Sequence, residues 1–191
     1  GIAAEWGLGN AGLGYVLAME LIGMAVGSVL LGGVADRIGR KPTIMGCLFA
    51  MVIGMFMVTT TSNLVELSIW RVLTGLGIGG MLAAINAVAA EFSNTRKRAF
   101  AISTMAIGYP VGGVVGGMIV TQLMQHFDWR SVFYFGTAAT LCFIPLVHFF
   151  MPESVHWQTR KQPEGALAKI NATMKRLGHS VITALPHIDA S

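Results

Sequence analysis

The sequence predicts an all-α membrane protein with five transmembrane helices, followed by a more polar segment. Of its 191 residues, 54% are hydrophobic and 12% are charged, and the mean hydropathy is +0.66. Too few polar side chains are available to cover a water-soluble fold. The apolar residues also form segments that reach or approach the roughly 20 residues a helix needs to cross a ~30 Å hydrocarbon core.

The five predicted spans cover residues 11–35, 43–62, 64–90, 99–125 and 131–151. Glu20 lies in the first span, Glu66 and Arg71 lie in the third, and the other three spans contain no Asp, Glu, Lys or Arg. The connection at residues 61–63 is so short that the helices it joins must run antiparallel. We expect residues 1–151 to form a helix bundle and residues 152–191 to begin a cytoplasmic linker.

The basic residues predict the orientation. Three follow the first span, three follow the third and five follow the fifth, so 11 of the 13 Lys and Arg residues lie on one side. By the positive-inside rule these loops are cytoplasmic and Gly1 is external. Although the net charge is +4, the basic residues separate apolar spans and do not form one soluble basic face, so nucleic acid is not an expected partner.

Glycine spacing distinguishes two kinds of span. Four-residue glycine repeats allow close backbone approach in lipid. They occur in the first, third and fourth spans, at Gly23, Gly27, Gly75, Gly79, Gly108, Gly112 and Gly116. We expect these three spans to pack inside the bundle, and the second and fifth, rich in Met, Phe and aliphatic residues, to face lipid.

The segment after the fifth span carries an apolar stripe of Leu167, Ile170, Met174 and Leu177. This spacing predicts an amphipathic helix on the cytoplasmic membrane surface. A solvated connector is the alternative interpretation.

The loop after the first span, residues 32–44, reads GGVADRIGRKPTI. It resembles the GxLaDrxGrkxxl signature of the major facilitator superfamily, with Val34 at the Leu position. Glycines permit a tight turn, and an Asp can sit at a helix N-terminus or pair with a base. The resemblance implies a gating loop that latches the two halves of such a transporter together in its outward-open state. The candidate gating residues are Gly32, Asp36, Arg37, Gly39, Arg40 and Lys41.

This resemblance also sets the register of the spans. It implies that they correspond to family helices two to six, so that the first helix and the six-helix second half lie outside this chain. Both would then be partners of the bundle. The third span agrees with this register, because Leu67, Arg71, Gly75 and Gly77 resemble the family's fourth-helix pattern lxxxRxxqGxg.

Two ionisable residues are expected deep in the membrane. Arg71 lies about 10 Å inside the external boundary and Glu20 about 13 Å deep, at ~1.5 Å per residue. Charges at such depth are costly and typically functional, so both are candidates for substrate binding or proton coupling. Glu20 is either a protonatable site or the ion-pair partner of Arg71, and Arg71 is alternatively an anchor that extends outward.

A further charge pair is predicted after the third span. Glu91 and Arg98 resemble the acidic and basic members of the family's ExxPxxxR pattern, with Asn94 where Pro is common. They form the candidate cytoplasmic charge network, and a solvated pair is the alternative.

Three short features refine the resemblance. The turn at residues 128–130, the Pro-Glu-Ser exit at 152–154 and the tail at 166–178 look most like aromatic-acid:proton symporters, and sugar porters share part of the pattern. The fourth span has Gly113 where drug/proton antiporters commonly carry Pro. This substitution argues against the antiporter branch.

The resemblance therefore implies a multi-pass protein of the bacterial inner membrane that takes up a small organic anion, most specifically an aromatic carboxylate, with protons. A sugar or other metabolite:proton symporter, a drug/proton antiporter, and a membrane receptor or assembly protein remain alternatives. The five histidines are scattered without an HExxH or GxSxG frame, which argues against an enzyme. Cys47 and Cys142 lack CxxC spacing, and no cofactor or metal is expected.

Overall fold

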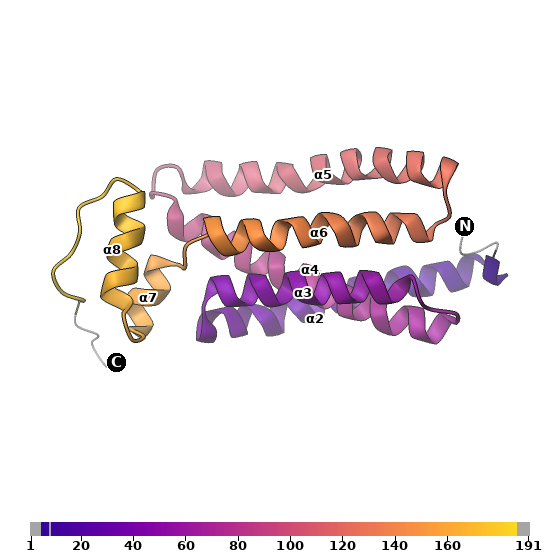
Figure 1. Cartoon of the computed structure of the whole chain (residues 1–191), viewed down its shortest axis with the longest axis horizontal. Coiled ribbons are helices and arrows are strands. Elements are labelled where there is room, and N and C mark those ends of the chain that lie inside the picture. The colour runs from indigo at the N-terminus through magenta and orange to yellow at the C-terminus, as the bar shows by residue number, and fades with distance from the viewer. Residues whose placement is uncertain (1–4, 8, 187–191) are drawn as a thin grey trace.

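The computed structural model describes residues 5–7 and 9–186 and confirms an all-helical membrane fold (Figure 1). Five helices are long and apolar enough to cross a membrane. They are α2 (Asn10–Ile38), α3 (Arg40–Val58), α4 (Leu64–Phe92), α5 (Arg98–His126) and α6 (Arg130–Phe150). Two shorter helices follow, α7 (Val155–Lys161) and α8 (Ala166–Arg176).

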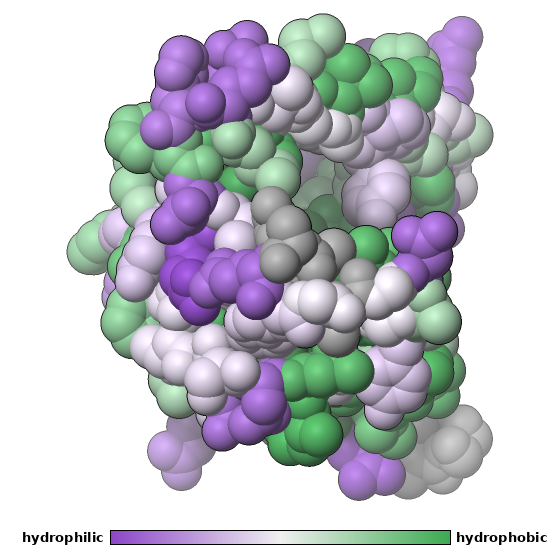
Figure 2. All heavy atoms as spheres, turned by 90° about the vertical axis from the view of Figure 1, so that its right-hand side faces the viewer, coloured by the Kyte–Doolittle hydropathy of each residue, from purple (hydrophilic) through white to green (hydrophobic). Residues whose placement is uncertain are grey.

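The five long helices run antiparallel, so alternate connections meet at the same end of the bundle (Figure 1). We call the end with the α2–α3 and α4–α5 connections, α7 and α8 the basic end, because it gathers 11 of the 13 Lys and Arg residues. The α3–α4 and α5–α6 connections lie at the opposite end, with the start of α2. Figure 2 looks onto that opposite end, where hydrophilic residues alternate with apolar ones around a hollow.

The α2–α3 connection is much tighter than predicted. Its helices continue through the expected loop and leave only Gly39 between them. Gly39 has φ +115°, a conformation that side chains rarely tolerate, and it breaks the helix. Gly32, expected to help form the turn, lies inside α2 instead.

Helices α2 and α4 meet through backbone contacts at four glycines. A Cβ at Gly23 would lie 2.5 Å from the Val72 carbonyl oxygen, and one at Gly27 would meet the backbone of Leu76. On α4, a Cβ at Gly75 or Gly79 would meet the α2 backbone. Close van der Waals approach of this kind is what joins helices in lipid, where the hydrophobic effect gives little attraction.

Helix α3 packs between α4 and α6, so the expectation that it mainly faces lipid is wrong. A Cβ at Gly77 would lie 2.9 Å from the Cys47 carbonyl oxygen. Ile44 and Leu48 on α3 are buried with Ala84 on α4. Two single glycines without four-residue spacing, Gly54 and Gly77, allow this approach.

Helix α6 does keep the exposed aromatic face that its composition predicts, with Phe149 and Phe150 each 70% exposed.

Helix α5 does not pack closely on the described helices, and its place inside the bundle stays a prediction. It was expected to pack inside the bundle, yet it contains no buried residue. A Cβ at Gly108, Gly112 or Gly116 would meet no atom of the described residues within 4 Å. Four-residue glycine spacing makes a helix able to pack closely but does not supply a partner, and the described helices place none across this face.

The segment after α6 forms two helices where one was expected. Helix α7 begins at Val155, and its N-cap Ser154 accepts a hydrogen bond from the Trp157 amide at 3.2 Å. Helix α8 buries Ala166, Ile170 and Thr173, whereas Leu177 of the predicted apolar stripe is 52% exposed. The buried face is therefore rotated from the predicted one. The position of this segment on a membrane surface stays a prediction, as does the domain boundary at residue 151.

The tail beyond α8 turns back along it (Figure 1). Asn171 holds Ile182 by two hydrogen bonds, donating to its carbonyl at 2.9 Å and accepting from its amide at 2.8 Å. Gln162 donates to the Pro186 carbonyl at 2.8 Å.

Candidate functional site

Glu20 and Arg71 form an ion pair between α2 and α4, with Arg71 Nη2 donating to Glu20 Oε2. Their side chains are only 19% and 16% exposed. The pair lies beside the backbone contact between α2 and α4, because Gly75 abuts the Glu20 carbonyl. The sequence left open whether these residues meet, and the structure brings them together.

The rest of the Arg71 guanidinium is buried against α6. Its central carbon lies 5.6 Å from the centroid of the Phe133 ring. Its Nε is buried and has no hydrogen-bond partner among the described residues. This burial does not fit an arginine that extends outward to the membrane surface. It leaves a cation with donor capacity that Glu20 does not use.

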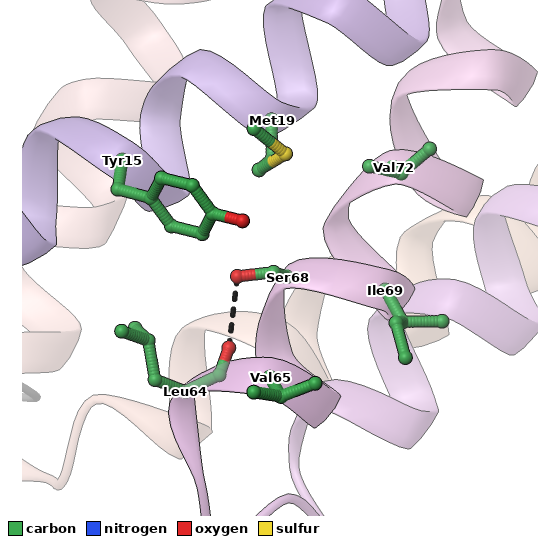
Figure 3. A pocket seen from close by; sticks show the side chains of 7 residues that line it. All are labelled: Tyr15, Met19, Leu64, Val65, Ser68, Ile69 and Val72. Carbon is green, nitrogen blue, oxygen red and sulfur yellow. Dashed lines mark hydrogen bonds between the residues drawn. The ribbon is translucent and has the colours of Figure 1, made fainter.

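An apolar groove of about 430 Å³ lies next to this pair, between α2 and the start of α4. In Figure 3, Tyr15 and Met19 of α2 face Ser68 and Val72 of α4. The Ser68 hydroxyl donates to the Leu64 carbonyl at 2.8 Å. Neither Glu20 nor Arg71 lines the groove, so a molecule in it would lie beside the charged pair and not between its members.

A second charged group lies at the basic end and centres on Arg40. Arg40 Nη1 lies 2.6 Å from Asp36 Oδ1, and Nη2 lies 2.9 Å from Glu91 Oε1. Glu91 also accepts a hydrogen bond from the Ser154 hydroxyl. Arg40 and Glu91 are 13% and 14% exposed, whereas Asp36 is 67% exposed. This group therefore connects α2, α3, α4 and the start of α7.

Glu153 caps the start of α3. Its carboxylate accepts hydrogen bonds from the amides of Arg40 at 2.9 Å and Lys41 at 3.2 Å. A carboxylate at a helix N-terminus is favoured by the unpaired amides and by the helix dipole. A Cβ at Gly39 would lie 2.5 Å from Glu153 Oε2, so a side chain there would displace the capping carboxylate.

Helix α7 is attached to the same loop, because the Trp157 indole donates to the Asp36 carbonyl at 3.2 Å. Lys41 Nζ donates to the His148 carbonyl at 2.7 Å, which ties the start of α3 to the end of α6. Arg37 is exposed and forms no salt bridge within the described part of the chain.

One predicted pairing is not formed. Glu91 pairs with Arg40, whereas Arg98 donates through Nε to the Ala90 carbonyl at 3.0 Å. Arg98 thus caps the carbonyl end of α4, where a cation is favoured. Glu153 and Ser154 also belong to the network and were not predicted from the sequence. One signal was available in the sequence: Glu153 directly follows the fifth span. It is therefore expected on the same side of the membrane as the loop from which the second span starts.

A third group, also missed, joins the connections at the end opposite the basic one. Arg130 Nη1 lies 3.0 Å from Glu5 Oε1, and Arg130 Nε donates to the Thr59 carbonyl at 3.2 Å. Trp129 donates from its indole to Glu5 and packs edge-to-face on Trp6 at 5.9 Å. Hydrogen bonds from Trp129 and Arg130 hold the pKa of Glu5 below its ordinary value.

Comparison with known proteins places the chain in a family. Residues 1–187 match the sequence profile of the Major Facilitator Superfamily. The chain belongs to the Major Facilitator Superfamily. Similar proteins include a gallate transporter of Pseudomonas putida, 30% identical over 91% of this chain and 38% of the relative. The 4-hydroxybenzoate transporter PcaK of Acinetobacter baylyi is 36% identical over 80% of this chain and 34% of its own length.

Solved structures agree on the fold of this superfamily member. The xylose transporter XylE from E. coli, in a partially occluded inward open conformation, has a TM-score of 0.74 at 22% identity. The match covers 88% of this chain and 46% of that one. The chain thus spans less than half the length of these relatives. The matched proteins are transporters and not enzymes, and several carry aromatic acids by name.

Proposed function

We propose that the full-length protein imports an aromatic carboxylate together with protons across the cytoplasmic membrane of a bacterium. The names of the gallate and 4-hydroxybenzoate relatives support this substrate class. The structural observation that carries the proposal is the buried Arg71, which has an unused Nε donor and one carboxylate partner. The likeness to a xylose transporter concerns the fold and does not favour a sugar.

Arg71 and Glu20 provide a chemical basis for coupling. An arginine has five N–H donors and binds carboxylates in a planar, two-point geometry. While Glu20 is ionised, it competes with a substrate carboxylate for the same guanidinium. A proton on Glu20 would weaken its hold on Arg71 and leave the cation for the substrate. Proton and anion would then be bound together and released together.

The charged group at the basic end is proposed to act as a latch. Arg40 at the start of α3 holds carboxylates of α2 and α4, so moving this end of α3 away from both helices requires both contacts to break. Packed interfaces of this kind tend to have two discrete arrangements. We expect Asp36→Asn to slow transport strongly without reducing the amount of protein in the membrane, because Asp36 is exposed. Wild-type turnover by this variant would remove the latch role from Asp36.

An uptake assay tests the substrate and the coupling together. Cells that express the full-length protein should accumulate labelled 4-hydroxybenzoate in preference to xylose, and a protonophore should abolish the accumulation. Glu20→Gln should abolish accumulation against a gradient. Glu66→Gln is the matched control, because Glu66 is an exposed carboxylate in the first turn of α4. Acid uptake that ignores the protonophore would contradict proton coupling, and preferential xylose uptake would contradict the substrate class.

A further inference from the structure

A pocket of about 460 Å³ lies at the basic end, beside the capped start of α3, with which it shares Lys41 and Glu153. Its walls come from the α2–α3 connection, the exit from α6, and helices α7 and α8. They include Ile38, Lys41, Trp157, Gln158 and Lys169. The polypeptide thus builds this pocket from segments that are far apart in the sequence.

Gln158 is the unusual member of the lining. It is 2% exposed, and its Oε1 has no hydrogen-bond partner among the described residues. Nearly all buried polar atoms in proteins are hydrogen-bonded, so an acceptor left alone beside a pocket requires an explanation. A bound molecule with an O–H or N–H donor would supply the missing partner.

The charges around the pocket favour a phosphate. Lys41 and Lys169 contribute two ammonium groups. Lys41 uses one donor on the His148 carbonyl and retains two, and Lys169 is exposed. Glu153 also lines the pocket, but its carboxylate accepts hydrogen bonds from the amides of Arg40 and Lys41, which reduces its repulsion of an anion.

The position of the pocket favours a lipid over a soluble anion. It lies at the end of the spans, where the headgroups of a bilayer would be, and its wall includes an indole, a side chain enriched at membrane surfaces. Apolar surface adjoins it, because Ile38 in its wall is 52% exposed. Basic pockets at membrane ends of helices are known to bind lipid headgroups.

We propose that this pocket binds a glycerophospholipid whose phosphate lies between Lys41 and Lys169 and whose headgroup donates a hydrogen bond to Gln158. Phosphatidylethanolamine and phosphatidylglycerol carry such a donor. Phosphatidylcholine carries the same phosphate but has no N–H or O–H in its headgroup. The site is independent of the transported substrate, so it stands whether or not the proposed function is correct.

Native mass spectrometry of the purified full-length protein, with the three lipids at matched acyl chains, tests the site. The wild type should retain the two donor-bearing lipids more strongly than phosphatidylcholine. Gln158→Leu should abolish that preference, because the acceptor is gone. Lys169→Gln should weaken binding of all three lipids by about fivefold, the usual effect of one lysine at a membrane surface. Lys175→Gln, an exposed lysine of α8 outside the pocket, is the matched control and should leave binding unchanged.

Three results would overturn the proposal. Equal retention of all three lipids by the wild type would show that Gln158 accepts no hydrogen bond from a headgroup. This measurement uses the wild type alone, so it does not depend on the folding of a variant. Equal weakening by Lys169→Gln and Lys175→Gln would reduce the effect to general surface charge. Displacement of the lipid by sn-glycerol 3-phosphate at the same concentration would assign the pocket to a soluble phosphate ester.

Discussion

Replacing Arg71 with Gln should show that α2 and α4 are joined by a charged pair and not by a neutral hydrogen bond. Both side chains are less than one fifth exposed. Removing one partner of a buried ion pair costs about 3–5 kcal/mol, because the other charge stays buried without compensation. A neutral hydrogen bond between membrane helices contributes only about 0.6 kcal/mol on average. The two interpretations therefore differ severalfold in energy.

A double-mutant cycle measures this difference. The full-length wild type, Glu20→Gln, Arg71→Gln and the double variant would be unfolded reversibly in mixed micelles, and their free energies of unfolding compared. We expect each single variant to lose about 3 kcal/mol or more and the double variant to recover most of that loss, since it leaves no unpaired charge. Glu66→Gln, at an exposed site, should change the free energy of unfolding by less than about 0.5 kcal/mol.

A coupling energy near 0.6 kcal/mol would refute the reasoning, since Glu20 would then be bound to Arg71 as a neutral acid. The proposal that a substrate carboxylate replaces the Glu20 carboxylate on Arg71 would then have no basis. Uptake provides the second readout: the double variant should be stable but unable to concentrate an aromatic acid.

Three other predictions concern packing, topology and pH. Gly79→Ala should destabilise the protein by about 1–3 kcal/mol, because its Cβ would meet the α2 backbone, while Gly46→Ala should be tolerated because no described atom lies within 4 Å. In a cysteine-free background, an impermeant reagent on intact cells should label Asn10→Cys but not Arg37→Cys, and the reverse pattern would invert the topology. The pKa of Glu5 is lowered in the folded protein. The contact between the Glu5 carboxylate and the Trp129 indole should therefore be fully formed at pH values above 4.5, the ordinary pKa of a Glu. It should be lost only when the pH falls through the lower pKa of the folded state. Tryptophan fluorescence should follow this loss, and Glu5→Gln should make the signal independent of pH across that range.

Hydropathy and charge were sufficient to predict the five spans, because lipid requires long apolar helices and excludes charges from most of them. From the sequence, contact between Glu20 and Arg71 was one of two alternatives and could not be predicted. Their similar depth could be counted in residues, whereas their facing depends on helix rotation. Rotation is set by the glycine contacts between α2 and α4, and no single helix contains that information.

The arrangement of the basic end was harder to predict. The resemblance to the ExxPxxxR pattern favoured Arg98 as the partner of Glu91, but Gly39 turns the chain so sharply that Arg40 pairs with Glu91. Glu153 could not be assigned for a related reason. A capping carboxylate is identified by the helix start that it faces, and that start lies more than a hundred residues earlier in the chain.

The Glu20–Arg71 pair and the Arg40 group both involve helices α2 and α4, and this relation bears on mechanism. Helix α2 carries Glu20 and Asp36, about 24 Å apart, and α4 carries Arg71 and Glu91, about 30 Å apart, at 1.5 Å per residue. Backbone contact between the two helices resists sliding, so they respond as one body to a change at Arg71. Helix α3 packs on α4 at Gly54 and Gly77, and at the basic end it is joined to α2 and α4 through Gly39 and the side chain of Arg40. A change at the buried pair can therefore reach the basic end as a rigid-body movement, and the contacts it must break there are those of Arg40.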